Sequence, residues 1–383
     1  MKTHHIPLLK LKIFLIFGLL ACSSKIETTT SQDIQEIEEQ EFFLTGADLS
    51  YVNEMEDCGV VYKNSDGSAE NVFQIFENNG ANIIRVRQWH TPNWTNYSNQ
   101  MDVEKTIKRA KELNMAVLLD FHYSDDWADP NQQIAPKAWL PILDNLPVLG
   151  DSIYNYTYKT LKKLNTKNLL PEIVQIGNEI NIMILQQDNT LTEMNWYRNA
   201  YLLNKGIQAV RDFSLHQHKK IDIMLHIAQP ENGLWWFDQA KSNGVIDFDW
   251  IGLSYYPKWS KYNLNQVSEV FKTLKERYQK KVMVVETAYP FTLENADDAN
   301  NILGMDAIIP RYEATQQGQL NYLLDLKKAI KNGDGLGLIY WEPAWVSNNC
   351  STRWGKGSHW DNATLFDKEN KPTLGMNFFN TDN

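Results

Sequence analysis

Cysteine, basic charge and long apolar runs are all scarce in this chain of 383 residues. Three cysteines are too few for a small scaffold held together by disulfides. The formal net charge of −10 argues against a broad basic surface, so we expect no nucleic-acid partner. The apolar run at residues 13–21 is less than half of the ~20 residues that a membrane-spanning helix needs.

Aromatic side chains, by contrast, are abundant: the chain has 13 Trp, 17 Tyr and 15 Phe. Aromatic rings stack on flat apolar faces such as those of sugar rings, so this composition favours a carbohydrate partner. The hydrophobic fraction of 43% is enough for a sizeable core. The length fits either two average domains or one large α/β barrel with appendages.

The first 22 residues have the features of an export signal. Lysines precede the apolar run at residues 13–21, which ends at Cys22. The sequence Leu-Leu-Ala-Cys at residues 19–22 resembles a bacterial lipobox, in which the cysteine is acylated and becomes the new N-terminus. We therefore predict a lipoprotein signal peptide at residues 1–22. The exported protein would be lipid-anchored to the bacterial envelope through Cys22, at the outer membrane or the cell surface. An ordinary signal peptide that happens to precede a cysteine is the alternative, and it also predicts export.

Residues 23–41 are polar and acidic and contain no aromatic side chain. Such a segment cannot bury enough apolar surface to offset the entropy lost on ordering. We therefore predict a disordered acidic tether between the lipid anchor and the folded part of the chain.

From residue 43 onward, short apolar runs alternate with segments of helical period, which is typical of a parallel sheet covered by helices. The predicted strands lie at residues 43–49, 82–87, 116–122, 172–177, 221–227, 249–255, 281–286 and 336–341. Helical periodicity is clearest at residues 68–79, 102–114, 192–212 and 315–331. Eight strand–helix units predict a (β/α)8 TIM barrel that forms one catalytic domain over residues 42–383. Its reactive groups should gather at the carboxyl ends of the strands.

Two glutamates stand at such strand ends. Glu179 follows the fourth predicted strand, and Glu286 ends the seventh. A glycosidic bond is cleaved by such a pair, in which one carboxylic acid protonates the departing oxygen and the other carboxylate attacks the anomeric carbon or activates water. The alternative for either residue is a structural ion pair, but their joint placement favours catalysis.

Further polar side chains lie at the same depth on neighbouring strands. Arg85 and Arg87 share one face of the second strand, and Asp120 and His122 share one face of the third. An arginine at this depth can hold a catalytic carboxylate ionised, or it can form a purely structural ion pair. Both readings stay open for Arg85 and for Arg87.

The later strands add aromatic and imidazole groups. Tyr255, at the end of the sixth strand, offers a phenol that can hydrogen-bond a carboxylate. Trp341, after the eighth strand, can form the floor of a sugar site or simply fill the core. His122 and His226 lack a third ligand at a metal-binding spacing, so we predict no catalytic metal.

Several strings of residues together resemble glycoside hydrolase family 53, the endo-β-1,4-galactanases of a large clan of retaining (β/α)8 enzymes. The similarity spans about residues 43–368. Its most specific string is Asp-Phe-His-Tyr-Ser-Asp-Asp-Trp-Ala-Asp-Pro at residues 120–130. The other matching strings are Gly-Ala-Asp at 46–48, Ile-Arg-Val-Arg at 84–87, Gly-Asn-Glu at 177–179, Ile-Gly-Leu-Ser-Tyr-Tyr-Pro at 251–257, Val-Val-Glu-Thr at 284–287 and Tyr-Trp-Glu-Pro-Ala-Trp at 340–345.

The resemblance implies endo-acting hydrolysis of β-1,4-galactosidic linkages in galactan or arabinogalactan, by double displacement with retention and without a cofactor. It makes Glu179 the acid/base, Glu286 the nucleophile and Asn178 a partner for the hydroxyl beside the reacting carbon. The predicted substrate-binding residues are Asp48, Arg85, Arg87, His122, Trp127, Asn178, Tyr255 and Trp341. The chain departs from the usual pattern at Ala288 and at Ile-Ala-Gln-Pro, residues 227–230. The departure at residues 227–230 leaves open how this chain contacts the sugar rings beyond the cleavage point.

Some members of the family also hold a structural calcium ion between the loops after the seventh and eighth strands. The corresponding oxygen ligands in this chain would be Asn295, Asp297, Asn301, Ser358 and Asp361. Only two of these five side chains are carboxylates, so affinity would be low. A polar loop stabilised by Asx turns is the alternative to a calcium site.

Cys58 lies shortly after the first strand and Cys350 shortly after the eighth, and these strands become neighbours when a barrel closes. An exported protein meets oxidising conditions, so we hypothesise a disulfide between them.

Two other functions remain open at this point. One is a retaining β-glycanase of the same clan that acts on mannan, xylan or glucan. The other is a surface glycan-binding lipoprotein without catalytic activity, against which the intact Glu179 and Glu286 weigh. Each reading has a polysaccharide partner, and none predicts an oligomeric state.

Overall fold

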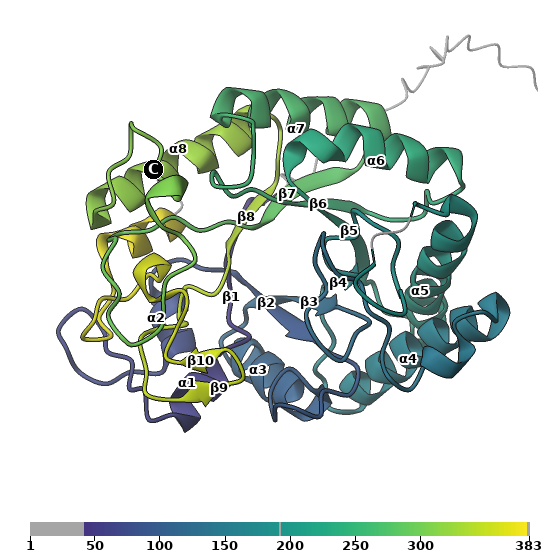
Figure 1. Cartoon of the computed structure of the whole chain (residues 1–383), viewed down its shortest axis with the longest axis horizontal. Helices are drawn as coiled ribbons and strands as arrows, with labels where there is room; N and C mark the ends of the chain where they lie inside the picture. The colour runs from purple at the N-terminus through teal and green to yellow at the C-terminus, as the bar shows by residue number, and fades with distance from the viewer. Residues whose placement is uncertain (1–41, 191–192, 381–383) are drawn as a thin grey trace, which may run out of the picture. The chain divides into compact units, whose positions relative to one another are not determined.

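The computed structural model describes residues 42–190 and 193–380. Its centre is a closed barrel of eight parallel strands in the order β1 to β8, in which β8 pairs with β1 (Figure 1). The strands are β1 Leu44–Asp48, β2 Ile83–Gln88, β3 Ala116–Phe121, β4 Ile173–Ile176, β5 Asp222–Ala228, β6 Trp250–Ser254, β7 Lys281–Glu286 and β8 Gly337–Tyr340. The predicted barrel and all eight predicted strands are confirmed.

Helices surround the barrel and connect its strands (Figure 1). They are α1 Val52–Asp57, α2 Val72–Asn78, α3 Gln100–Glu112, α4 Leu146–Thr166, α5 Trp196–Gln217, α6 Pro230–Ser242, α7 Leu264–Tyr278 and α8 Gln316–Asn332. Several begin at a side chain that caps free backbone N–H groups: Asn99 before α3, Asn263 before α7 and Thr315 before α8. Four short 3-10 helices lie in loops: Leu140–Ile142, Met305–Ala307, Asp361–Ala363 and Leu374–Phe379.

The apolar core has two parts, as the period of two along a strand requires. One part lies between the strands and the surrounding helices. The other fills the inside of the barrel with Ile83, Leu118, Ile173, Met224, Trp250, Met283, Val285 and Ile339, all of them at most 4% exposed. This interior plug closes the barrel below the carboxyl ends of the strands, so a ligand can enter only from above it.

The loops at the carboxyl ends of the strands are fastened to one another. Cys58, after α1, forms a disulfide with Cys350, after β8, with their Cα atoms 5.8 Å apart. Cys350 directly precedes a small hairpin of β9 Ser351–Thr352 and β10 Gly355–Lys356. The disulfide therefore fixes the base of this hairpin to the first strand–helix unit.

Residues 1–41 lie outside the described part of the chain. The predictions of a signal peptide at 1–22, acylation of Cys22 and a tether at 23–41 all fall there. Among residues 42–190 and 193–380, no helix is both long enough and apolar enough to cross a membrane.

Candidate active site

A cleft of about 800 Å³ opens at the carboxyl ends of the strands, and both predicted catalytic glutamates line it. Glu179 follows β4 through Gly177 and Asn178, and the backbone of both Gly177 and Glu179 is left-handed, with φ of +81° and +44°. A non-glycine residue at positive φ is strained, and such strain is concentrated at functional sites. Here the left-handed turn leaves two consecutive side chains, Asn178 and Glu179, lining the cleft.

Glu286 reaches the cleft through an irregularity in the sheet. Met283 and Val285 already face the inside of the barrel, so strict alternation would turn Glu286 outward. The register between β6 and β7 shifts at this point, because Leu253 pairs with Val284 but Ser254 pairs with Glu286. Such a bulge re-aims the side chain that follows it, and Glu286 thereby points into the cleft.

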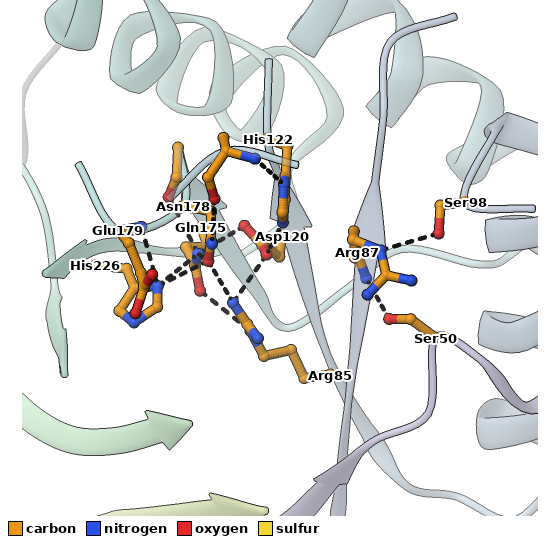
Figure 2. Close-up of polar contacts among 12 residues, drawn as sticks. Ser50, Arg85, Arg87, Ser98, Asp120, His122, Gln175, Asn178, Glu179 and His226 are labelled. Carbon is orange, nitrogen blue, oxygen red and sulfur yellow. Dashed lines mark hydrogen bonds and ion pairs between the residues drawn. The ribbon is translucent and has the colours of Figure 1, made fainter. Parts of the chain in front are cut away.

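Arg85 is the centre of the polar network beneath Glu286. Its Nη1 lies 2.8 Å from Glu286 Oε1 and 2.9 Å from Asp48 Oδ2, and its Nη2 lies 2.8 Å from Asp120 Oδ2. The same Nη2 donates to Asn178 Oδ1 at 2.8 Å. Figure 2 draws Arg85 among Asp120, Gln175 and Asn178. Burial disfavours the guanidinium charge, but Asp120, Glu286 and Asp48 outweigh this and raise the pKa of Arg85. The arginine is thus a fixed cation that holds Glu286 in place.

Glu286 has a second hydrogen-bond donor, the phenol of Tyr256, at 3.2 Å from its Oε2. Tyr255, which we predicted for this role, is fully buried on the other side of the strand and donates to the carbonyl of Tyr262. The prediction for Tyr255 is therefore wrong. The period of two explains the error, because Ser254 faces the barrel interior and the next inward side chain is that of Tyr256.

Glu179 has different neighbours. Its Oε1 lies 2.5 Å from the hydroxyl of Ser254, and that hydroxyl lies 2.8 Å from Nε2 of His226. No arginine or lysine forms an ion pair with Glu179 within the described residues. The two carboxyls therefore differ: Glu286 forms an ion pair with a cation, and Glu179 accepts a hydrogen bond from a neutral hydroxyl.

This difference decides which carboxyl is protonated. Burial raises the pKa of Glu179 well above its ordinary value, and the negative charge of Glu286 raises it further. Burial also raises the pKa of Glu286, to about 7, but Arg85 opposes that rise. One proton shared by the pair thus resides on Glu179, which leaves Glu286 as the carboxylate.

Arg87 forms part of the aromatic wall and does not contact either catalytic glutamate. It pairs with the buried Glu342 at 3.1 Å and donates to Ser98 at 3.1 Å. Its guanidinium also lies over the ring of Trp127, 4.2 Å from the ring centre. Arg87 therefore forms a structural ion pair, which was one of its two predicted roles, and it also lines the cleft beside the tryptophan whose ring it orders.

The other predicted substrate-binding residues all line the cleft: Asp48, Arg85, His122, Trp127, Asn178 and Trp341. His122 contacts Asp120 at 3.1 Å, and burial lowers the pKa of its ring. Asn178 uses one amide hydrogen to bind the carbonyl of Ala128.

Several functional side chains were missing from the sequence-based site. These are Gln175, His226 and Ser254 beneath the glutamates, Tyr256 beside Glu286, and Trp345, Trp354 and Trp360 in the cleft wall. The period of two could have found Ser254 and Tyr256, which continue the inward face of Trp250 and Gly252. No local signal marks Trp354 or Trp360, because long loops bring them to the cleft.

The five predicted calcium ligands lie close together, but most of their oxygens accept hydrogen bonds from nitrogen. Asp297 Oδ2 accepts the backbone N–H groups of Asn348 and Ser358. The amide Nδ2 of Asn301 donates to Asp361 Oδ1 at 2.7 Å and to Asn295 Oδ1 at 2.9 Å. A nitrogen donor therefore stands where a cation would need an oxygen ligand, so the arrangement does not fit calcium. Among the described residues, no cluster of three or more His, Cys, Asp or Glu side chains could hold a metal ion.

The sequence of this chain matches a known family of proteins over most of its length. The sequence profile of Glycosyl hydrolase family 53 matches residues 44–379, which is most of the chain. The chain belongs to glycosyl hydrolase family 53. The resemblance predicted from the sequence is confirmed.

Individual members of family 53 are similar over most of their length. The arabinogalactan endo-beta-1,4-galactanase of Cellvibrio japonicus (strain Ueda107) is 54% identical over 344 residues, which cover 89% of this chain and 91% of that protein. The endo-beta-1,4-galactanase of Bacillus subtilis (strain 168) is 32% identical over 378 residues, covering 88% and 85% of the two chains. Among solved structures, the GH53 catalytic domain of Ignisphaera aggregans superposes with a TM-score of 0.79 at 32% identity, covering 88% of this chain and 95% of that one.

Two residues of the family 53 chain at the departure 227–230, Ala228 and Gln229, line the cleft. Gln229, part of the departure at residues 227–230, lines the cleft with a left-handed backbone at φ +62°. Its side-chain oxygen accepts the backbone N–H of Tyr256 at 3.4 Å. The departure therefore changes a wall of the cleft and leaves the catalytic pair unaltered.

Proposed function

We propose that this protein is an endo-β-1,4-galactanase that cleaves galactan and arabinogalactan with retention of anomeric configuration. The observation that carries the proposal is the unequal pair of carboxyls in one cleft: Glu286 forms an ion pair with Arg85 at 2.8 Å, whereas the Glu179 carboxyl accepts a hydrogen bond from Ser254 and has no cationic partner among residues 42–190 and 193–380. This difference supplies one acid and one nucleophile. Membership in family 53 and the similarity to the endo-beta-1,4-galactanases of Cellvibrio japonicus and Bacillus subtilis support β-1,4-galactan as the substrate.

In the first step Glu286 attacks the anomeric carbon, and the bond from that carbon to the departing chain breaks. Glu179 gives its proton to the oxygen of the departing chain, which leaves with a free hydroxyl. Arg85 and Tyr256 hold the attacking carboxylate in one orientation, so little reorganisation is needed.

In the second step water attacks the same carbon from the side that the departing chain has left. Glu286 has lost its negative charge to the ester, so the pKa of Glu179 falls and its carboxylate can accept a proton from the water. The bond between Glu286 and the sugar then breaks. Two inversions at one carbon give net retention.

The walls of the cleft supply the surface for a chain of sugar rings. Six tryptophans line it: Trp127, Trp259, Trp341, Trp345, Trp354 and Trp360. Trp259 and Trp354 are 47% and 40% exposed, which suits stacking against sugar rings away from the reacting one. A wall with aromatic faces at several places favours an internal stretch of polysaccharide over a chain end.

The test is product analysis on linear β-1,4-galactan. We expect oligosaccharides of mixed length early in the reaction, and an NMR time course in which the first new reducing ends are β-anomers. Glu286→Ala is the matched control for contaminating activity. Release from mannan, xylan or glucan but not from galactan would assign the protein to another β-glycanase activity. Binding of galactan without products would favour a glycan-binding lipoprotein.

We also propose that the protein is exported and lipid-anchored to the bacterial envelope through Cys22. The support is the basic start, the apolar run at 13–21 and the Leu-Leu-Ala-Cys sequence, all of which precede the described residues. Cys22→Ser should move the protein from the membrane fraction to the soluble exported fraction. Unchanged fractionation of this variant would contradict anchoring at Cys22.

Calcium stays a prediction from the family resemblance. Binding would require the amide of Asn301 to rotate, so that Oδ1 and not Nδ2 faces Asp361. If the ion binds, millimolar calcium raises the melting temperature, and EDTA and Asp297→Ala each abolish that effect. A melting temperature that is the same in calcium and in EDTA would exclude the site.

A further inference from the structure

Two tryptophans outside the cleft form an aromatic pair on neighbouring helices. The rings of Trp196, the first residue of α5, and Trp235, in the second turn of α6, lie 6.3 Å apart with their planes at 66°. Trp235 is 56% exposed, whereas the next residue, Trp236, is fully buried in the core. Figure 1 shows α5 and α6 side by side around the barrel. We call Trp196 and Trp235 the outer aromatic pair.

The ring of Trp235 is exposed but held in place. A single apolar side chain in water is common on protein surfaces, but Trp235 is not isolated. The ring of Trp196 contacts both Trp235 and the buried Trp236, whose ring centre is 5.4 Å away. The core therefore fixes Trp196, and Trp196 limits the orientations of the exposed ring. Such an indole is a preformed stacking surface, since little freedom is lost when a ligand binds to it.

The outer aromatic pair continues the rim of the cleft along α6. Asn232, which lines the cleft, precedes Trp235 by three residues on this helix. Residues at this spacing are neighbours on a helix surface, and Trp235 lies about 4.5 Å farther along the helix axis. Both side chains are exposed. A ligand that extends out of the cleft past Asn232 therefore reaches the indole of Trp235.

Hydrogen bonds hold the rim and the start of α5 in one arrangement. Asn181 and Asn232, which both line the cleft, donate to the carbonyl oxygen of Ala228 at 3.0 and 2.8 Å. With its Nδ2 held in this way, Asn232 keeps its amide oxygen as an acceptor for a sugar hydroxyl. Arg198, in the first turn of α5, donates to the carbonyl of Ile184 at 2.6 Å, in the loop that carries Asn181. The cleft rim and the outer aromatic pair are thus parts of one ordered surface.

We propose that the outer aromatic pair is a second galactan-binding site, which holds the part of a bound chain that extends out of the cleft past Asn232. Indole faces stack on the apolar faces of sugar rings, and a neutral polysaccharide needs no charged partner. The linkages of β-1,4-galactan use the axial 4-hydroxyl of galactose, so the chain curves and can follow the surface from the cleft onto the outside of α6. This inference rests on galactan as the substrate in the proposed function.

The first test measures binding by the full chain with Glu286→Ala, so that the ligand is not hydrolysed. In this parent, Trp235→Ala should weaken the affinity for long β-1,4-galactan by about 3- to 10-fold. The affinity for galactotriose should not change, because the cleft alone can hold a trisaccharide. Trp235→Phe keeps an aromatic face and should restore most of the affinity. Tyr197→Ala is the matched control, since Tyr197 is 77% exposed but points about 100° away from Trp196 around α5.

Weaker binding of long galactan by Trp235→Ala, with Trp235→Phe and Tyr197→Ala close to the parent, supports the second site. Equal affinities of Trp235→Ala and the parent would overturn it. A parent that does not bind galactan at all would refute galactan as the substrate, and the inference with it. If Trp235→Ala changes the sedimentation coefficient and leaves galactan binding unaltered, the pair is a contact between copies of this chain and the proposal is wrong.

The second test locates the bound chain on the protein. Fluorine NMR of the full chain with Glu286→Ala, labelled with fluorotryptophan, reports on each indole, and Trp235→Phe assigns the signal of Trp235. Long galactan should shift this signal, whereas galactotriose should shift signals of the cleft tryptophans and leave that of Trp235 in place. A Trp235 signal that does not move at saturating long galactan would overturn the proposal, even if the cleft signals show that galactan is bound.

Discussion

The inside of the barrel has two layers of opposite chemistry on the same strands. In four strands an apolar side chain of the lower layer is followed two residues later by a polar one of the upper layer: Ile83 by Arg85, Leu118 by Asp120, Ile173 by Gln175 and Met224 by His226. All eight side chains are at most 3% exposed. Burial is therefore equal in the two layers, and only the chemistry differs.

Burial therefore has a different consequence in each layer. The lower layer stabilises the folded state by removing apolar surface from water. Different apolar side chains can do this, provided that together they fill the space. The upper layer stabilises only if each polar group has its partner, because an unpaired buried charge is costly. Arg85 meets this condition through Asp48, Asp120 and Glu286. Burial of these groups disfavours charge, and Arg85 offsets this effect at Glu286 but forms no ion pair with Glu179. Glu286 is therefore the carboxylate, and Glu179 is the protonated carboxyl.

The largest expected effect comes from removing the nucleophile in the upper layer. Glu286→Ala should lower kcat on galactan by at least ~10⁴-fold, because no covalent intermediate can form. Binding of galactan should persist, since the tryptophan wall is unchanged, and affinity electrophoresis measures it. Turnover within a hundredfold of the wild type would mean that another residue is the nucleophile.

Removing only the acid should have a smaller and substrate-dependent effect. Glu179→Gln should slow cleavage of galactan by about 10² to 10⁴-fold, because the departing oxygen no longer receives a proton. Aryl galactosides with good leaving groups need no proton, so their first step should be slowed far less. Pre-steady-state release of the aryl group compares the two substrates, and equal slowing for both would contradict the assignment.

A matched pair on β3 separates the two layers. Leu118→Ala in the lower layer should cost about 2–5 kcal/mol of unfolding free energy through the cavity it leaves, with unchanged activity per folded molecule. Asp120→Leu in the upper layer leaves Arg85 short of one partner and should reduce both stability and kcat. Urea unfolding combined with active-site titration distinguishes them. Loss of activity per folded molecule in Leu118→Ala would show that the layers are not separable.

The smallest effect is a dependence of rate on pH. Catalysis needs Glu286 ionised, and burial raises its pKa, so activity should fall about tenfold per unit on the acid side of a limb that lies above the ordinary range of glutamate. Catalysis also needs Glu179 protonated, so activity should fall on the alkaline side of a second limb. Glu179→Gln should lose the alkaline limb and keep the acid one. An acid limb near pH 4 in the wild type would contradict the raised pKa.

Much of the site could be predicted from local pattern. The period of two placed Arg85 and Asp120 inside the barrel, and the order of strand–helix units brought Glu179 and Glu286 to the same end. The same rule, applied past the end of β6, would have selected Tyr256 in place of Tyr255. The partners of Arg87 could not be read in this way, because Glu342 is 255 residues away in sequence.

The sequence by itself determined the barrel, the family and the strand ends at which the glutamates lie, because apolar periodicity and short motifs are local properties of the chain. Only the tertiary structure decided how these side chains are aimed and paired. The extra residue at Val285 turns Glu286 inward, and the left-handed backbone of Glu179 leaves its side chain lining the cleft. Closure of the barrel then brings Arg85 into an ion pair with Glu286 and the hydroxyl of Ser254 into a hydrogen bond with Glu179. Those contacts join separate strands, and the protonation of each carboxyl follows from them.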